Sequence, residues 1–321
     1  MSATGLTAMA VVASSATSSS AASASASSSA SSSAVTRRCP LRKVAAAAGF
    51  TLVELLVVVA IIAALTALAL PVILHARSAS ERVREVASAR MLSMAWQQYA
   101  QDANGAILPG YKSGLPAYDE THGPIATQTI GVAANRWVWR LAPYIGHDLR
   151  ALYVGDHERL LHELEATDMS NYLYQTSVFP SFGLNSVWVG GDETYGGFNS
   201  AFLGLFGKFY ASRLSEIPQP ASLIVFGSAH GQDAAPGGGM GELTEGFFRV
   251  RSPNFDTRTW ASAYDAADAA SWGNLSARHG GDIVVSYADG HAEPRAPQEL
   301  DDMRLWAPNA DAKDWKLTPQ Q

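Results

Sequence analysis

The chain has 321 residues, 47% hydrophobic and 16% charged, which is enough for one large domain or two ordinary domains with a buried core. This composition excludes a disordered acidic chain. The formal charge of −6 is unevenly distributed along the chain. Residues 1–49 hold four basic side chains and no acidic one, whereas the remainder holds 19 basic and 29 acidic residues and so has a formal charge of −10. That balance argues against a duplex nucleic-acid binder, and the single cysteine, Cys39, excludes a disulfide scaffold and a CxxC metal site.

The N-terminal segment up to Thr36 is almost entirely alanine and serine. Such a segment cannot bury enough apolar surface to offset its loss of conformational entropy, so we expect it to be disordered or to lie upstream of the true start codon. A basic stretch from Arg37 to Lys43 follows it. We therefore treat residues 1–49 as an extension with a basic leader.

From Leu55 to Leu74 the chain has 20 residues without a formal charge. At about 1.5 Å per residue, a helix of this length crosses a hydrocarbon core of about 30 Å. Three interpretations compete: a secretory signal, an uncleaved anchor, and a leader that is cleaved before the helix. Residues 67–69 (Ala-Leu-Ala) resemble a signal cleavage site, but the apolar part of a signal is usually only about 7–15 residues long and Glu54 would lie inside it.

Glu54 favours the cleaved leader. A carboxylate in lipid costs on the order of 2.5–3.5 kcal/mol, so this side chain needs a partner. Cleavage after Gly49 supplies one, because the new amino terminus at Phe50 lies four residues away on the same helix face.

The stretch GFTLVELLVVVAIIAALTALALP resembles the leader junction and first helix of type IV prepilins and type II secretion pseudopilins. The matching residues are Gly49 before the cleavage site, Phe50 as the first mature residue, Glu54 at the fifth mature position and Pro71 at the twenty-second. The resemblance implies cleavage by an inner-membrane prepilin peptidase, N-methylation of Phe50, assembly with other pilin subunits, and a cytoplasmic leader with the bulk of the chain in the periplasm. A leader of 49 residues is longer than usual in this family. This length argues against the assigned start codon and not against the cleavage junction between Gly49 and Phe50.

Beyond Pro71 the pattern becomes amphipathic, with apolar residues at helical spacing beside arginines and glutamates. We expect one helix over residues 50–103, ending at Ala103-Asn104-Gly105, where Asn and Gly tolerate a left-handed cap. The aromatic residues Trp96 and Tyr99 are expected to anchor a sheet to this helix.

Residues 104–321 predict a β-rich domain, giving an α+β, pilin-like fold in which an antiparallel sheet packs on the long helix. The expected strands are Tyr172–Phe179, Gly183–Val189, Leu223–Ser228, Phe247–Arg251 and Ile283–Ala288. Asp156–Ala166 alone predicts a second helix. The segments Gly231–Gly246 and Pro253–Leu275 are too long for plain hairpin loops, and long loops commonly carry binding specificity.

Asp289-Gly290 follows the last expected strand and predicts a type I′ turn. His279 precedes Asp289 by ten positions, and this spacing resembles a C-terminal motif of large prepilin-like families in planctomycetes, verrucomicrobia and relatives. The segments PSFGLNS (180–186) and RLSEIPQPASLIVFGSAHG (213–231) resemble upstream parts of the same families. The motif of His279, Asp289 and Gly290 thus indicates a relationship to these families but does not indicate a chemical function.

We expect no catalytic site and no cofactor. His279, Asp282, Asp289 and His291 are residue types that bind zinc or relay protons, but backbone geometry alone explains Asp289 at an Asp-Gly turn. Calcium is the one cation that the resemblance suggests as a ligand, since similar pseudopilins bind it through acidic loops. The candidate ligands in glycine-rich loops are Asp192, Glu193, Glu242 and Glu245.

The sequence therefore predicts a structural subunit of a type II secretion pseudopilus or a type IV pilus-like filament, held in the inner membrane by one helix. The alternative is a membrane-anchored or filament-borne module that captures polysaccharide through exposed tryptophans. Its candidate tryptophans are Trp137, Trp139, Trp188, Trp260 and Trp272. Burial of these side chains would argue against a glycan platform.

Overall fold

A computed structural model describes residues 51–119, 123–124, 131–154, 157–234, 240–278 and 280–320. The leader and its junction at Gly49 and Phe50 lie outside these residues, as does His279. The chain divides into two units, Met1–Val58 and Val59–Gln321.

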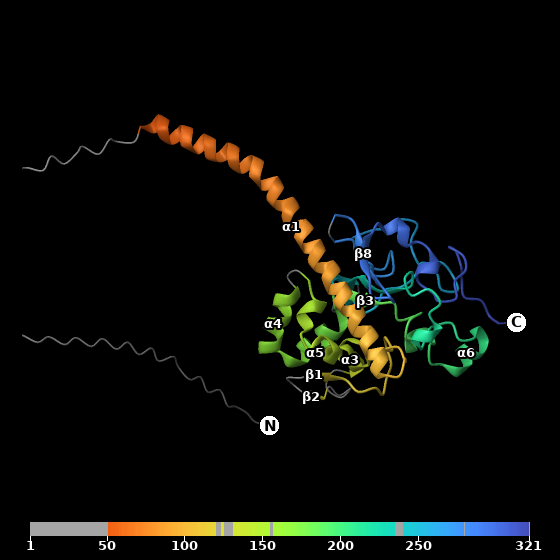
Figure 1. The fold of residues 1–321 in the computed structure, drawn as a ribbon. Helices are drawn as coiled ribbons and strands as arrows, with labels where there is room; N and C mark the ends of the chain where they lie inside the picture. Colours follow the sequence, from red (N-terminus) through yellow and green to blue (C-terminus); the bar gives the residue numbers. More distant parts are fainter. Residues whose placement is uncertain are drawn as a thin grey trace, which may run out of the picture. The chain divides into compact units, whose positions relative to one another are not determined.

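The first helix, α1, runs from Leu52 to Asp102 and passes through Pro71 without interruption. It ends as predicted: Asn104 and Gly105 adopt positive φ values of 54° and 85°, and the Gly105 amide donates to the Ala100 carbonyl. Its second half buries a stripe at helical spacing, which includes Glu85, Ala89, Leu92, Trp96 and Ala100. This part of α1 is a core element of the second unit (Figure 1).

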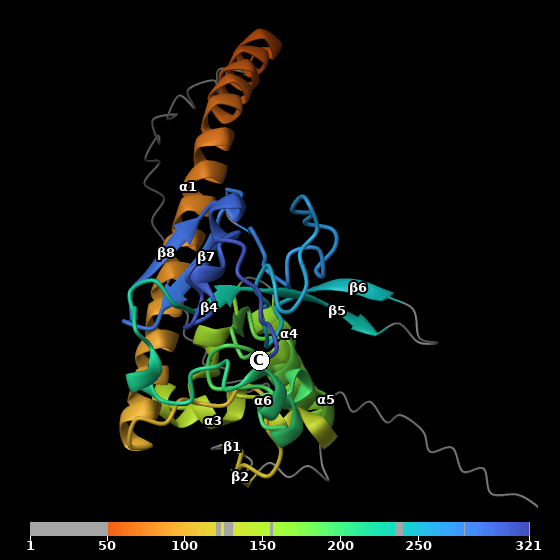
Figure 2. The same ribbon diagram turned by 90° about the vertical axis from the view of Figure 1, so that its right-hand side faces the viewer.

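A four-stranded antiparallel sheet has the strand order β3-β4-β7-β8. Its strands are β3 (Phe182–Leu184), β4 (Ile224–Ser228), β7 (Ile283–Tyr287) and β8 (Ala292–Arg295). Figure 2 shows β7 and β8 beside α1. The predicted strands at 223–228 and 283–288 are confirmed, and every residue of β4 and β7 is buried because both faces of the sheet are covered.

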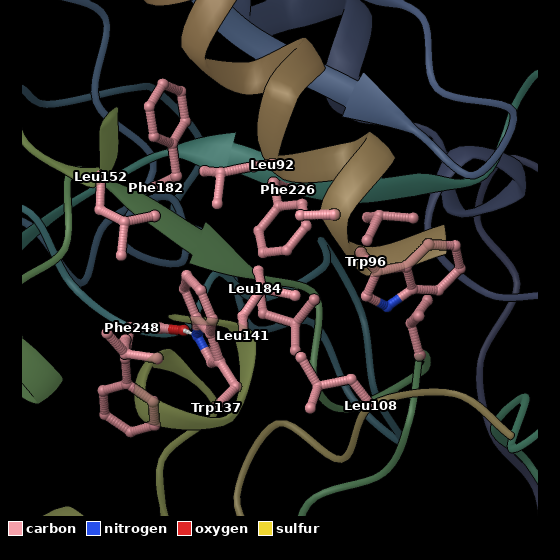
Figure 3. Close-up of a cluster of buried hydrophobic side chains, with 14 of the residues drawn as sticks. Leu92, Trp96, Leu108, Trp137, Leu141, Leu152, Phe182, Leu184, Phe226 and Phe248 are labelled. Atoms are coloured by element: carbon pink, nitrogen blue, oxygen red, sulfur yellow. Dashed lines mark hydrogen bonds between the residues drawn. The ribbon is translucent and has the colours of Figure 1, made fainter. Parts of the chain in front are cut away.

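Alternation along β7 assigns its side chains to two hydrophobic clusters. Val284 belongs to the cluster that contains Leu92 and Trp96 of α1, whereas Ile283, Val285 and Tyr287 belong to a second cluster. Because successive side chains of a strand point to opposite faces, the clusters occupy the two faces of the sheet. Trp96 is fully buried in the first cluster, as predicted for an anchor between helix and sheet (Figure 3).

The chain between α1 and β4 contains several short helices besides strand β3. Its described elements are β1 (Tyr118–Asp119), β2 (Gly123–Pro124), α3 (Val138–Leu141), α4 (His157–Thr167), α5 (Met169–Val178) and α6 (Ser200–Phe206). Short 3-10 helices join them at Gly131–Asn135, Ala142–Ile145, Leu149–Leu152, Glu193–Tyr195 and Leu214–Glu216, and two more lie at Pro297–Leu300 and Met303–Leu305. The helix expected near 156–166 is confirmed as α4, but the expectation that it would be the only further helix is wrong.

The predicted strand Tyr172–Phe179 is wrong, since this segment forms helix α5. Asp168 caps the helix by accepting a hydrogen bond of 3.1 Å from the Asn171 amide, and Tyr172 and Thr176 are buried at a spacing of four. The aromatic and β-branched content indicated a strand, while the cap and the spacing determine a helix.

Two further strand predictions are wrong in extent. Only the first part of Gly183–Val189 is a strand, because Asn185 turns inward and its amide donates to the carbonyls of Ile224 and Trp306. Phe247–Arg251 follows the edge of β3 but forms only an isolated bridge, between Leu184 and Arg249. Conversely, the predicted loop Gly231–Gly246 contains a hairpin of β5 (His230–Ala234) and β6 (Met240–Glu245).

Candidate functional site

The first part of α1 is an apolar helix with exposed side chains. The large apolar residues from Leu52 to Leu70 are each 43–78% exposed, and the most apolar window of α1 has a mean hydropathy of 2.9 with none of it buried. By length and composition α1 can cross a membrane once. A water-soluble surface seldom carries so long an apolar stretch, so this segment needs lipid or other helices around it.

Glu54 closes a capping box at the start of α1. The Thr51 amide and hydroxyl donate to Glu54 Oε2 at 2.9 and 2.8 Å, and the Glu54 amide donates to Thr51 Oγ1 at 3.2 Å. The Thr-x-x-Glu spacing that forms the box is visible in the sequence, although only the Phe50 amine was predicted as a partner of Glu54. The carboxylate therefore has a local structural function in addition to any pairing between chains.

Three side chains of α1 hold the β7–β8 hairpin. Arg90 donates to the Ala292 carbonyl at 3.3 Å, Ser93 to the Tyr287 carbonyl at 2.7 Å and Gln97 to the Ala288 carbonyl at 2.7 Å. These side chains are three and four positions apart, so they lie on one face of α1 and can contact the same hairpin. The hairpin tip that carries Asp289 and Gly290 is thus fixed to α1 through its backbone.

The turn at this tip is not the predicted type I′. Gly290 has a φ of 97°, but Asp289 does not adopt a positive φ, and a type I′ turn needs both. The Gly290 amide donates to the Tyr287 carbonyl, and the Tyr287 amide to that of His291. The loop is a three-residue turn with glycine in the left-handed position. The predicted position of the turn is therefore confirmed, but its predicted type is wrong.

Asp289 interacts with its neighbour His291. Its Oδ1 accepts from the His291 amide at 3.1 Å and lies 2.6 Å from His291 Nδ1. Partial burial opposes ionisation, but the hydrogen bonds from His291 outweigh it and hold the pKa of Asp289 below its ordinary value. The other residue weighed for zinc, Asp282, lies 3.4 Å from Arg82 of α1 and forms an ion pair with it.

Arg278, next to His279, makes a second charged contact with α1. Its guanidinium pairs with Glu85 of α1 at 2.5 Å and with Glu245 at 2.7 Å, and it donates to the carbonyls of Ser181 and Ala229. The Glu85 and Arg278 side chains are 2% and 7% exposed. We call this pair the Glu85–Arg278 clamp. Sequence reasoning missed it; the one available signal was an acidic residue in the apolar stripe of α1.

Three of the acidic loop residues considered for calcium have other partners in the structure. Asp192 is buried and pairs with Arg249 at 2.8 Å, Glu193 accepts from Ser113, and Glu245 pairs with Arg278. The Glu242 side chain lies outside what the structure describes. Within the described part of the chain, no three His, Cys, Asp or Glu side chains gather as a metal site.

Residues 45–70 match the prokaryotic N-terminal methylation motif. The chain has a type IV pilin-like N-terminus. The match covers the expected cleavage junction and the exposed apolar part of α1, and processing by a prepilin peptidase follows from it. No curated protein and no solved structure matches the chain.

The tryptophans of the alternative interpretation are core residues of the second unit. Their exposed fractions are 4% or less: Trp137, Trp139, Trp188, Trp260 and Trp272. Trp137 donates from Nε1 to the Phe248 carbonyl at 2.7 Å (Figure 3), and Trp260 and Trp272 stack with their centroids 4.5 Å apart. The alternative that these side chains form a glycan platform is therefore wrong.

Proposed function

We propose that the chain is a structural subunit of a type II secretion pseudopilus or a type IV pilus-like filament, cleaved after Gly49 and N-methylated at Phe50. The observation that carries the proposal is the exposed apolar helix at the position of the methylation motif. A helix of this kind can hold the precursor in the inner membrane and later pack against the helices of other subunits.

The proposed mechanism is mechanical. The domain C-terminal to α1 lies in the periplasm, and subunits leave the membrane by stacking their apolar helices into a filament core. Glu54 of one subunit pairs with the Phe50 amine of another, which neutralises both charges and fixes the register, as a polar residue does in a coiled-coil core. The partners are the prepilin peptidase and other pilin or pseudopilin subunits.

The structure supports this mechanism through the attachment of the domain to α1. Arg90, Ser93 and Gln97 bind the β7–β8 hairpin, and the Glu85–Arg278 clamp binds the sheet. These contacts join α1 and the domain over several helical turns, as the transmission of a force from the helix to the domain requires.

Protein isolated from membranes tests the processing step. The mature chain is expected to begin with N-methylated Phe50 and to contain no cysteine, because Cys39 leaves with the leader. N-terminal sequencing and intact mass spectrometry report both features. Gly49→Leu is the matched control and should retain Cys39 and the leader. An intact wild-type chain, or one that starts near Leu70, would contradict the proposal.

A further inference from the structure

A cavity of about 390 Å³ lies where the end of α1, the β7–β8 turn and the segment 214–220 meet. Its lining residues are Gln97 and Gln101 of α1, Ala288 and Asp289 of the turn, and Leu214, Ile217 and Pro220 of the segment. The turn and this segment both belong to the stretches that resemble prepilin-like families, and the filament proposal gives neither of them a role. The volume lies within the range of roughly 300–1,000 Å³ that is typical of small-molecule sites.

Hydrogen bonds join the walls of this cavity. Gln97 of α1 donates from its side chain to a carbonyl of the turn at 2.7 Å, and the Asp289 amide donates to the Pro220 carbonyl at 3.1 Å. The segment connects back to the end of α1 through the Leu214 amide, which donates to the Gly105 carbonyl at 2.9 Å. The cavity is therefore preformed, and a ligand does not have to order its walls on binding.

The cavity has an apolar floor and a polar, open mouth. Ile217 and Ala288 are only 8% and 5% exposed, so they lie at its floor. Gln101 and Asp289 are exposed, so they lie at its mouth and are accessible from solvent. A ligand with one apolar end and one polar end matches this division.

The polar groups of the cavity are mainly acceptors. The contacts of Asp289 with His291 use Oδ1, and Oδ2 adds a second acceptor to the same carboxylate. The side-chain nitrogen of Gln97 already donates to the turn, which leaves its Oε1 as an acceptor, and Gln101 adds a further amide oxygen. None of the described residues that line the cavity is basic. The cavity is therefore suited to a cation that carries several N–H donors and not to an anion.

We propose that this cavity binds a small organic amine, with its ammonium group against Asp289 at the mouth and its apolar part against Ile217 on the floor. An ammonium group has three donors and no acceptor, which fits a carboxylate flanked by amide oxygens. A lysine side chain of another protein fits less well, because its ammonium group would enter first and reach the apolar floor. The proposal is independent of the filament function, since amine binding can fail while processing at Gly49 proceeds.

Three ligands with the same apolar part test the choice of charge. In calorimetric titrations of the full mature chain in detergent, 2-phenylethylamine should bind saturably. The neutral 2-phenylethanol should bind at least about tenfold more weakly, as expected for the loss of a hydrogen-bonded charge, and phenylacetate should show no saturable binding. Titration into protein-free detergent supplies the blank, and Nα-acetyl-lysine methylamide, as the lysine arm, should bind more weakly than the amine.

Three variants assign the binding to the cavity. Asp289→Asn keeps a residue that suits the turn but removes the charge, and should weaken amine binding at least about tenfold. Gln101→Leu changes an exposed position of α1 outside the turn and should weaken binding by about three- to tenfold, so it still decides if Asp289→Asn fails to fold. Asp282→Asn is the matched control and should leave binding unchanged, because Asp282 lies outside the cavity and its side chain is 34% exposed against 35% for Asp289.

Four results would overturn the proposal. They are equal affinity for the amine and the alcohol, unchanged affinity in folded Asp289→Asn, an equal loss in Asp282→Asn, and a lysine derivative that binds as tightly as the amine. A rise in melting temperature with 2-phenylethylamine, absent in Asp289→Asn, would support the proposal independently, because a ligand that binds only the folded state stabilises that state.

Discussion

The Glu54 carboxylate combines two roles that substitutions can separate. Glutamine can serve in a capping box but carries no charge, whereas leucine removes both the cap and the charge. We expect Glu54→Gln and Glu54→Leu both to insert and to be processed, since each removes a charge from the membrane segment. Both should fail to cross-link with wild-type subunits, because neither can pair with the Phe50 amine.

Thr51→Ala is the complementary control for Glu54. It removes the hydroxyl of the cap, which costs about 1 kcal/mol of helix stability, but keeps the carboxylate. This variant should still cross-link. If Glu54→Gln assembles as well as wild type, the negative charge has no role in register and the proposed pairing is wrong.

The hairpin tip gives a second prediction at the scale of single residues. Gly290 has a φ of 97°, which a β-branched side chain resists, so Gly290→Val should lower the free energy of unfolding by at least the roughly 1–2 kcal/mol of left-handed strain. Asp289→Asn should be milder, because asparagine also suits this turn. Thermal melts of the full chain in detergent compare them, and equal losses would contradict the turn assignment.

The Asp289–His291 contact predicts a pH dependence. Because the pKa of Asp289 is lowered in the folded state, its contribution to stability is present above the ordinary aspartate pKa of about 3.9 and is lost as the pH falls through the lowered value. The difference in melting temperature between wild type and Asp289→Asn should therefore be largest near neutral pH and disappear in acid. A difference that grows as the pH falls would mean that the protonated form is the stabilised one.

At the scale of elements, the Glu85–Arg278 clamp should be essential to the attachment of α1. Arg278→Met leaves the buried Glu85 carboxylate without its arginine and should lower the free energy of unfolding by about 3–5 kcal/mol. The double variant Glu85→Leu/Arg278→Met should recover most of that loss, because replacing a whole buried pair by apolar groups is often neutral. Denaturant unfolding of the full chain in detergent measures both.

The exposed pair on the same helix is the control for the clamp. Arg77 and Glu81 lie 2.9 Å apart but are 77% and 42% exposed, so Arg77→Met should change stability by no more than about 0.5 kcal/mol. If Arg278→Met has an equally small effect, the clamp contributes nothing to the attachment of α1.

Elements with one dominant signal could be predicted from the sequence. α1 has a long apolar run and a left-handed stop, and β4 and β7 are short apolar runs buried on both faces. α5 could not be assigned by its composition, since Tyr172 and Thr176 suit a strand as well as a helix. Its capping residue, Asp168, was the available signal. The β5–β6 hairpin was missed because its strands are rich in polar residues and glycine.

The candidate site was predictable only where its contacts are local. The Thr51–Glu54 box spans three positions, and the Asp289–His291 contact spans two. The partners Glu85 and Arg278 are separated by 193 positions, and only the folded sheet brings them together. The contact of the Arg136 guanidinium with the Tyr174 ring, 5.6 Å from its centroid, likewise depends on α5, a segment that the sequence had assigned to a strand.

For the whole molecule, cleavage after Gly49 would change both charge and redox chemistry. It removes four basic residues and leaves a mature chain with a formal charge of −10 and no cysteine. An acidic surface limits non-specific association between subunits, so assembly depends on specific contacts such as the proposed Glu54–Phe50 pair. The loss of Cys39 also means that a single introduced thiol reports on one position of the mature protein.

That cysteine-free mature chain allows a direct test of the periplasmic location. Ser200→Cys places a thiol at the exposed start of α6, and a membrane-impermeant maleimide should label it in cells whose outer membrane alone is permeabilised. Ser286→Cys, at a fully buried position of β7, should stay unlabelled unless the protein is denatured. Labelling of Ser200→Cys only after the inner membrane is lysed would place the domain in the cytoplasm and contradict the proposed orientation.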